Sequence, residues 1–494
     1  MAVFLRDDKG NVAILFALAL LPLCTLMGAA IDYSRATESL VHLQAAVDST
    51  AMNLAKLPLT TGPANLEHHA EAQVRALAQA GFVTPLVTKV ERAADTITVT
   101  ASGDVKTAIL NVMRIDKVPL SATSTVARGM GRVELALVLD NTGSMAGKKL
   151  ASLKAAATDL VESLEQQVDP GVENALRIGL VPFSMTVNVG AGHVSAPWMD
   201  LAAASPIHGE IFSSPANRFS LFKKIGVPWG GCVEGRPIPY DVQETAPSAG
   251  TPATLFVPFF APDEPDSNFD NDYLDDDVSS WSSWRIKQGN PGKYDRQPNR
   301  TGTFTSGYQY GPNAGCALEP LVRLTTATQQ VKTAISAMTA VGDTNIPIGL
   351  IWGWHLLSPQ APFSDGIAYG TKDYTKFVVL MTDGQNASSV VSTQNQSIYS
   401  GLGYIWQNRL GIDSGSAGQR QAAMDKRLTL LCANMKARGI QIFTVRVEVT
   451  EGTSKVLRDC ATTPDMFYDV QDSSALSSAF RAIGASINRL RISR

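Results

Sequence analysis

Two patterns of apolar residues recur through most of the chain, and each predicts one kind of element. Short continuous apolar runs, at residues 135–139 and within residues 376–382, predict strands buried on both faces. Apolar residues spaced three and four apart predict amphipathic helices, the clearest of which spans residues 148–166. Because strands and helices alternate, we expect an α/β fold with a mostly parallel, doubly wound sheet. The other elements predicted here are strands at residues 177–183 and 440–447 and helices at residues 329–341, 348–357, 427–438 and 474–490.

The N-terminal part of the chain follows another pattern. Residues 12–31 form an uncharged run of 20 residues, long enough to cross a bilayer as a helix at about 1.5 Å per residue. An apolar stripe at helical spacing continues beyond it and predicts a stalk helix over residues 32–57. No small-residue cleavage site closes the run, so we expect a permanent single-pass anchor rather than a cleaved signal peptide.

Charged residues beside the anchor predict its orientation. Arg6 and Lys9 precede the run, and Arg35 follows it. Positive charges are more frequent on the cytoplasmic side of membrane helices, which favours a cytoplasmic N-terminus over residues 1–11 and export of the remainder.

Two segments depart from the strand–helix alternation. Residues 64–128 combine two predicted helices with short strands and predict a small α+β unit. Its elements are helices at residues 64–81 and 107–114 and strands at residues 86–90, 96–101 and 118–127. Residues 188–324 are rich in proline, glycine and aromatic residues and are too long for an ordinary loop. We interpret them as an insertion.

Composition and motifs exclude several functions. The formal net charge of −3 gives no electrostatic basis for nucleic-acid binding, and the 45% hydrophobic content is sufficient for a large core. The sequence has no HExxH or GxSxG motif, and its histidines have no ligand or triad spacing. We therefore expect no enzyme, no small-molecule substrate and no nucleic-acid partner.

The cysteines indicate disulfide bonds in the exported part. Cys24 lies in the apolar run, and the other four cysteines allow three pairings. Their order and the domain organisation favour Cys232–Cys316, which would staple the insertion, and Cys432–Cys460. Each bond would add about 4 kcal/mol on the chain-entropy account. The alternative is four buried free thiols.

The loop after the first buried strand carries the candidate chemistry. Asp140, Thr142 and Ser144 place one carboxylate and two hydroxyls on the same side of a tight turn. Hard oxygen ligands of this kind suit a small divalent cation, typically Mg²⁺. Thr344 follows a predicted helix, and Asp383 follows the second buried strand. Open α/β sheets bind ligands at the carboxyl ends of their strands, where these loops are expected.

Together the three loops resemble the metal-ion-dependent adhesion site of von Willebrand factor A (VWA) domains. The resemblance implies a Rossmann-like VWA domain over residues 132–494 that contains the insertion. It also implies a divalent cation, Mg²⁺ first and Mn²⁺ or Ca²⁺ as alternatives, held by Asp140, Thr142, Ser144, Thr344 and Asp383. Thr142 departs from the serine usual in this family but keeps the ligand atom.

These loops have two other interpretations. The simpler one is that Asp140 and Asp383 only cap helices after strands. The other is a phosphate loop at residues 143–149, but this segment is one residue short and lacks a Ser or Thr after the lysine. We reject the phosphate loop and with it an ATPase.

The N-terminal helix carries a second resemblance. The segments Gly10-Asn-Val-Ala-Ile-Leu-Phe-Ala-Leu, Ala29-Ala-Ile-Asp32-Tyr-Ser and Leu43-Gln44-Ala-Ala-Val-Asp48 are similar to TadE/TadG-type proteins of the Flp (tight adherence) pilus machinery. The similarity covers about residues 9–56 and, with the VWA-type region, makes the whole chain most like TadG. Leu15 stands where pilins carry glutamate, so we expect no prepilin cleavage.

An acidic stretch of the insertion matches the spacing of a calcium-binding loop. Its oxygen ligands would be Asp266, Asn268, Asp270, Asp272 and Asp277. Asn271 replaces the usual turn glycine, and the closing Asp277 is shorter than the usual glutamate. A solvated acidic loop is the alternative. Nearby aromatic residues predict either a contact surface or the core of the insertion; they are Trp281, Trp284, Tyr294, Tyr308 and Tyr310.

The sequence therefore predicts a non-enzymatic, single-pass membrane protein. The resemblance to the pilus proteins implies that the membrane is the bacterial inner membrane and that most of the chain is periplasmic or surface-exposed. The two resemblances imply a role in Flp pilus assembly or surface adhesion through metal-dependent protein binding. Its partners would be proteins of the pilus machinery or a surface ligand. The alternatives are a minor pilin-like subunit of the fibre and an envelope hydrolase.

Overall fold

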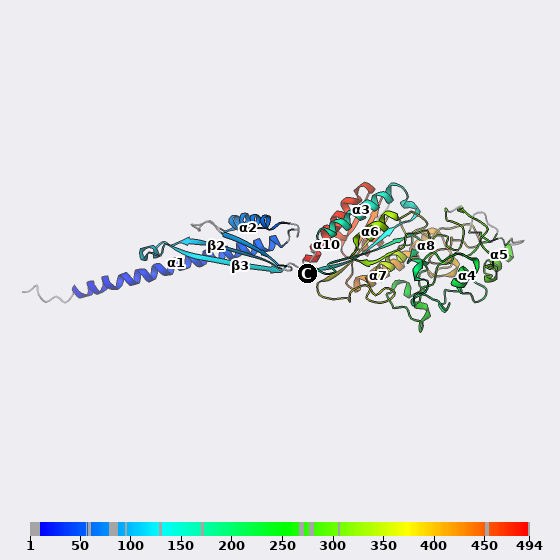
Figure 1. Cartoon of the computed structure of the whole chain (residues 1–494), viewed down its shortest axis with the longest axis horizontal. Coiled ribbons are helices and arrows are strands. Elements are labelled where there is room, and N and C mark those ends of the chain that lie inside the picture. The colour runs from blue at the N-terminus through cyan, green and yellow to red at the C-terminus, as the bar shows by residue number, and fades with distance from the viewer. Residues whose placement is uncertain are drawn as a thin grey trace, which may run out of the picture. The chain divides into compact units, whose positions relative to one another are not determined.

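The computed structural model describes most of the chain: residues 10–55, 57, 61–78, 87–93, 96–127, 131–168, 172–265, 271–274, 276, 281–304, 307–449 and 454–492. The chain divides into two compact units, and each is considered by itself (Figure 1). The first comprises Met1–Met130 and Gln167–Glu173, and the second comprises Gly131–Gln166 and Asn174–Arg494.

The first unit packs two helices on a three-stranded antiparallel sheet of order β1-β2-β3. Its elements are α1 (Gly10–Leu54), α2 (Pro63–Leu77), β1 (Val87–Arg92), β2 (Thr96–Lys106), the 3₁₀ helix η1 (Leu110–Met113) and β3 (Lys117–Ala127). The predicted apolar stripe on α1 is buried against α2 and the sheet, with Leu43, Val47 and Ala51 at 0% exposure. The stalk helix and the small α+β segment therefore share one core.

The first half of α1 is apolar and exposed. Phe16, Leu23 and Met27 have exposed fractions of 64%, 55% and 66%. Exposed apolar residues of this density are typical of a helix that lies in lipid. The helix is long and apolar enough to cross a membrane, in agreement with the predicted membrane anchor.

A turn of the sheet is attached to α1 where this apolar half ends. Both carboxylate oxygens of Asp32 accept backbone hydrogen bonds, at 2.8 Å from Ala108 and Ile109 and 2.7 Å from Leu110. One helical turn earlier, a Cβ atom at Gly28 would stand 2.2 Å from the Ile109 side chain. Glycine at position 28 therefore lets the turn approach α1, and Asp32 satisfies the amides at the start of η1.

The second unit is built on a mainly parallel eight-stranded sheet of order β11-β10-β9-β4-β5-β6-β7, with β8 paired to β5. Its strands are β4 (Arg132–Asp140), β5 (Leu176–Phe183), β6 (Val187–Asn188), β7 (Cys232–Val233), β8 (Val322–Thr325), β9 (Tyr374–Thr382), β10 (Gln441–Val447) and β11 (Phe467–Val470). The central strands β4 and β9 are buried along almost their whole length, as their continuous apolar runs predict.

Helices cover both faces of this sheet. Figure 1 shows α3 (Lys148–Glu165), α6 (Thr328–Ala337) and α10 (Leu476–Ile492) together, where α3 packs on the other two. Helix α7 (Ile346–Leu357) packs on β4 and on α8 (Ala417–Ala437), which contacts α9 (Lys455–Cys460). The predicted doubly wound α/β fold is confirmed.

Some predicted elements differ from the observed ones. A helix was predicted over residues 427–438, but α8 starts at Ala417, where Ser416 and Gln419 form a capping box. Its first turns are polar, so apolar spacing does not detect them. The helix predicted over residues 107–114 is only the 3₁₀ turn η1, and the strand predicted over residues 96–101 extends to Lys106.

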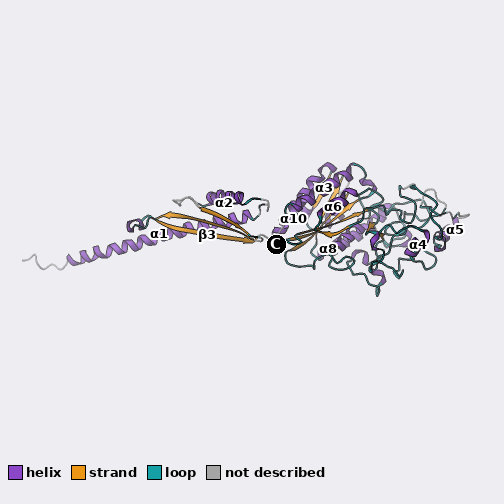
Figure 2. Ribbon diagram, viewed as in Figure 1, coloured by secondary structure: helices purple, strands orange, loops and turns teal. Residues whose placement is uncertain are grey.

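The segment between β6 and β8 consists mostly of loops (Figure 2). It contains the helices α4 (Arg218–Ile225) and α5 (Trp281–Gln288). The remaining 3₁₀ helices of the second unit are η2 (Gly143–Met145), η3 (Ala191–His193), η4 (Tyr240–Val242), η5 (Pro252–Thr254), η6 (Pro291–Lys293), η7 (Ile405–Gln407), η8 (Pro464–Met466) and η9 (Ser473–Ala475). Disulfide bonds join Cys232 to Cys316 and Cys432 to Cys460, which is the predicted pairing.

Aromatic residues and buried ion pairs form the core around the segment between β6 and β8. Trp284, Tyr294 and Tyr308 are at most 8% exposed, so they contribute to packing rather than to a contact surface. Tyr310 is half-buried, and the side chain of Trp281 lies outside the described residues. Arg218 is fully buried in an ion pair with Glu234, which also lies 2.7 Å from Arg409. Buried charges require such pairing.

Candidate metal centre

The candidate metal ligands come from three loops at the carboxyl edge of the parallel sheet. Asp140 is the last residue of β4, and Asp383 follows the last residue of the adjacent strand β9. Thr344 lies in the loop before α7. The carboxyl ends of neighbouring parallel strands open onto one crevice, where such sheets bind ligands.

Asp140 is a buried carboxylate held by neutral donors. Its side chain is 0% exposed, and it accepts hydrogen bonds from the Thr142 backbone N–H at 2.8 Å and the Thr382 hydroxyl at 2.6 Å. Burial raises the pKa of Asp140 to about 6, against the opposing effect of these hydrogen bonds. Within the described part of the chain no cationic side chain forms an ion pair with it. A buried carboxylate of this kind is stabilised by a bound cation.

Two hydroxyls connect Asp140 to the third loop. The Thr142 hydroxyl lies 3.0 Å from that of Ser144, and Ser144 donates to Oδ1 of Asp383 at 2.7 Å. Asp140, Thr142, Ser144 and Asp383 thus form one hydrogen-bonded group.

Thr344 is held beside this group by backbone contacts. Its Oγ1 lies 3.7 Å from the position of a Cβ atom at Gly384, and its carbonyl accepts the Ala387 N–H at 2.8 Å. In the same loop, the Gly342 carbonyl accepts the Gly143 N–H at 2.9 Å. Gly342 has φ +84°, a conformation that favours glycine. The second loop is therefore joined to both of the others.

Three contacts were not predicted from the sequence. The Thr382 hydroxyl donates to Asp140, and Lys149 Nζ lies 2.7 Å from Oδ2 of Asp383 and 3.8 Å from Oε2 of Glu448. In the sequence, Lys149 is notable only as part of the rejected phosphate loop. Its position one turn after an Asp-x-Thr-x-Ser loop was the available signal, because the first turn of the following helix lies beside that loop.

The donor set fits a hard divalent cation. It offers two carboxylates and three hydroxyls and contains no thiolate or imidazole. Such oxygen donors suit Mg²⁺, Mn²⁺ or Ca²⁺. The fit is supported by the buried Asp140 carboxylate, which has only neutral donors around it.

The predicted calcium loop cannot be described in full, because Asp266, Asn268, Asp270 and Asp277 lie outside the described residues. Asp272 is buried rather than solvated, and its carboxylate lies 2.9 Å from Arg300.

Asp272 also belongs to a cluster of carboxylates with Asp263 and Asp276, whose oxygens lie within 4.8 Å of one another. Lys293 Nζ lies 2.6 Å from Asp263 and 2.9 Å from Asp276. Lys293 neutralises Asp263 and Asp276, and Arg300 pairs with Asp272. We therefore interpret the cluster as an ion-pair network.

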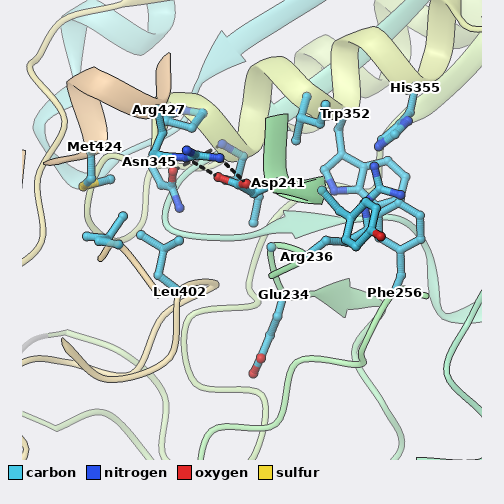
Figure 3. Close-up of a pocket in the computed structure, with 16 residues that line it drawn as sticks. Glu234, Arg236, Asp241, Phe256, Asn345, Trp352, His355, Leu402, Met424 and Arg427 are labelled. Atoms are coloured by element: carbon cyan, nitrogen blue, oxygen red, sulfur yellow. Dashed lines mark hydrogen bonds and ion pairs between the residues drawn. The ribbon is translucent and has the colours of Figure 1, made fainter. Parts of the chain in front are cut away.

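A separate cavity of about 30 Å³ lies between α7 and α8 (Figure 3). Trp352 and His355 line it from α7, and Arg427 lines it from α8, where it pairs with Asp241 at 2.5 Å. Both ring nitrogens of His355 are buried and lack hydrogen-bond partners within the described ranges, and burial lowers its pKa well below the usual value. A cavity of this size holds about two water molecules.

A larger groove adjoins the candidate metal centre. Its volume is about 530 Å³, and Gly384, Gln385 and Asn386 of the third loop line it together with residues of α8 and α9. Asn386 accepts the Ile346 N–H at 3.0 Å and donates to Asp425 of α8 at 2.7 Å. The groove thus begins one residue from Asp383.

Comparison with known proteins identifies the N-terminal segment. Residues 10–52 match the family model for the Flp pilus-assembly TadE/G-like domain. This confirms the resemblance predicted for about residues 9–56. The comparison with curated proteins gives no match.

The chain resembles solved structures only distantly. The vWF domain of the type V pili tip protein Mfa5 from Porphyromonas gingivalis is 12% identical, with 74% of this chain and 97% of that chain covered and a TM-score of 0.34. The pilus adhesin RrgA from Streptococcus pneumoniae is 10% identical, with coverages of 82% and 50% and a TM-score of 0.34.

A third similar structure is proximal thread matrix protein 1 from the mussel byssus, with a zinc-occupied MIDAS motif. It is 12% identical, with coverages of 74% and 47% and a TM-score of 0.31. This chain therefore spans about half the length of the adhesin and of the byssus protein.

Proposed function

We propose that this chain is a membrane-anchored, non-enzymatic protein of Flp pilus assembly or surface attachment that binds a protein partner through a divalent cation. The pilus-related role is supported by the TadE/G-like match over residues 10–52. The membrane anchor is supported by the exposed apolar half of α1. The cation is the part of the proposal that specifies a mechanism.

The observation that carries the mechanism is the buried Asp140 carboxylate at the carboxyl edge of the sheet. It has no ion-pair partner within the described residues, and hydroxyls surround it. In the proposal Asp140, Thr142, Ser144, Thr344 and Asp383 hold the ion, Mg²⁺ in the first place. When bound, the ion supplies a positive charge to which a carboxylate of the partner can bind.

This chain's own residues orient that contact. The hydrogen bonds among Asp140, Thr142, Ser144 and Asp383 set the directions of the side-chain oxygens before the ion arrives. The groove beside Gly384 then offers space for the partner chain on either side of its acidic residue. Binding energy in such interfaces is concentrated in a few central contacts, and here the ion is the central one.

The proposed topology places residues 1–11 in the cytoplasm and the bulk of the chain in the periplasm or at the surface, with the helix in the inner membrane. Arg6 and Lys9 support this orientation. The two disulfide bonds support it as well, because such bonds persist in oxidising compartments outside the cytoplasm.

The proposal is tested by complementing a strain that lacks this chain with the Asp140→Ala variant. We expect normal protein levels but a loss of Flp pili, counted by electron microscopy, or of surface attachment. Asp159→Ala is the matched control, because Asp159 is an exposed residue of α3. If Asp140→Ala supports piliation and attachment as well as wild type does, the ion-dependent mechanism is wrong.

A further inference from the structure

The ammonium group of Lys149 lies where the candidate metal centre needs positive charge. Its Nζ is 2.7 Å from Oδ2 of Asp383, a carboxylate whose side chain is 0% exposed. The other oxygen of that carboxylate accepts the Ser144 hydroxyl. Within the described residues, Lys149 is the only cation paired with one of the five candidate ligands.

The position of Lys149 on its helix is electrostatically unfavourable unless it serves this contact. It lies in the first turn of α3, where the amide groups already create a partial positive charge. The turn contains no acidic residue, and the preceding Gly147 provides no side-chain cap. The lysine is therefore stabilised by Asp383 rather than by its own helix.

A second acceptor lies close to the same ammonium group. Oε2 of Glu448 is 3.8 Å from Lys149 Nζ. Glu448 follows β10 with φ +51°, and its other oxygen accepts the Ser473 N–H at 3.0 Å. Its side chain is 30% exposed and that of Lys149 is 24% exposed, so neither is confined to a closed core. Lys149 can thus exchange Asp383 for Glu448 by a small change of rotamer.

We propose that Lys149 is an internal competitor of the metal ion: its ammonium group neutralises Asp383 in the ion-free protein and transfers to Glu448 when the ion binds. This inference rests on the proposed ion site. A divalent cation and an ammonium group cannot share Oδ2 of Asp383 without strong repulsion at this distance. Lys149 therefore lowers the affinity for the ion, and Glu448 partly restores it by accepting the displaced charge.

The consequence is an ion-free state that is folded and electrically balanced. Without Lys149, two acidic side chains would meet at the centre without a counter-charge, which destabilises a folded protein. With Lys149, the centre tolerates the absence of the ion. The affinity of the centre for the ion then depends on Lys149 and Glu448 as well as on the ligand atoms.

The test measures Mn²⁺ binding by the full-length protein in detergent micelles, from the loss of the sharp EPR spectrum of free Mn²⁺. We expect Lys149→Met to raise the affinity by about tenfold or more, because it removes a competing charge. Glu448→Gln should lower the affinity by about threefold, because the displaced ammonium loses its acceptor. Lys148→Met is the matched control and should stay within about twofold of wild type, since Lys148 is exposed and contacts none of the ligands.

Thermal unfolding of the same variants gives an independent readout. In EDTA, Lys149→Met should melt below wild type, because Asp383 loses its counter-charge. In saturating Mn²⁺ the variant should gain more than wild type does. A lysine with a purely structural role would lower both melting temperatures equally.

The outcomes separate the inference from the proposed function. If Asp140→Ala abolishes Mn²⁺ binding but Lys149→Met leaves the affinity unchanged or lower, the inference that Lys149 competes with the ion is wrong. The proposed ion site is then still supported. If Lys149→Met does not fold, an unchanged Mn²⁺ affinity of Glu448→Gln overturns the inference by itself. If neither the wild-type protein nor any variant binds Mn²⁺, the proposed ion site and the inference about Lys149 are both wrong.

Discussion

Replacing Glu134 by glutamine should destabilise the second unit more than any exposed charge substitution. Glu134 is 0% exposed on β4, and the sheet register places it between Arg177 of β5 and Lys376 of β9. Its carboxylate pairs with both cations, and it accepts the Ile367 N–H at 3.0 Å. One carboxylate therefore balances two cations at the amino ends of the three central strands.

The magnitude follows from the exposure of the partners. The Lys376 side chain is 6% exposed and that of Arg177 is 15% exposed, so water screens neither charge well. Removing one partner of a buried ion pair costs about 3–5 kcal/mol, because the remaining charge stays buried. The amide of glutamine keeps the size of the side chain, so little of this cost arises from packing. We expect Glu134→Gln to lower the free energy of unfolding by about 3–5 kcal/mol.

The assay is urea unfolding of the full-length protein followed by tryptophan fluorescence, since the tryptophans belong to the second unit. Glu162→Gln serves as control: Glu162 is an exposed residue of α3 and lies 3.6 Å from Lys332. This pair should be worth less than about 1 kcal/mol. If both substitutions have equally small effects, the pairing of Glu134 with two buried cations is wrong.

Three further predictions concern the disulfides, pH and the ion. Replacing both Cys432 and Cys460 by alanine should lower the free energy of unfolding by about 3–4 kcal/mol in urea titrations, because the bond closes a loop with a sequence separation of 28. The folded-state pKa of His355 lies below its unfolded value, so its neutral form contributes stability above about pH 6.5 that is lost as pH falls. His355→Leu should therefore reduce the fall in melting temperature on acidification, and an unchanged slope would contradict the burial of a neutral imidazole. Mg²⁺ at 100 times its dissociation constant should stabilise wild type by about 2.7 kcal/mol relative to EDTA. Calorimetry should show no such gain for Asp140→Ala and a full gain for Asp159→Ala.

The fold was largely predictable because the central elements carry local signals. The continuous apolar run before Asp140 appears as β4, and the helix predicted over residues 148–166 appears as α3. The sequence signal was weaker where tertiary contacts determine the bounds of an element. The start of α8 is polar, and the backbone amides at the start of η1 donate to Asp32, which lies 76 to 78 positions earlier on α1. Apolar spacing contains neither kind of information.

The candidate site was predictable as far as its loops resemble a known arrangement. The positions of Asp140 and Asp383 follow from the rule that parallel strands open at one edge. The contact of Lys149 with Asp383 joins residues 234 apart in sequence; the position of Lys149 indicates that it lies beside the first loop, but not that Asp383 is its partner. The same holds for Arg218, Glu234 and Arg409, which meet from three separate segments.

The disulfide of the insertion has a mechanical consequence. Cys232 and Cys316 are separated by 84 residues, which would extend to about 280 Å if pulled straight at about 3.3 Å per residue. The covalent bond prevents the residues between the two cysteines from being extended, because tension applied at the chain ends passes through the sulfur atoms. The Cys432–Cys460 bond removes a further 28 residues. Force on this protein would therefore unravel only the residues outside the two closed loops, while the residues between each pair of cysteines, including β10, stay unextended.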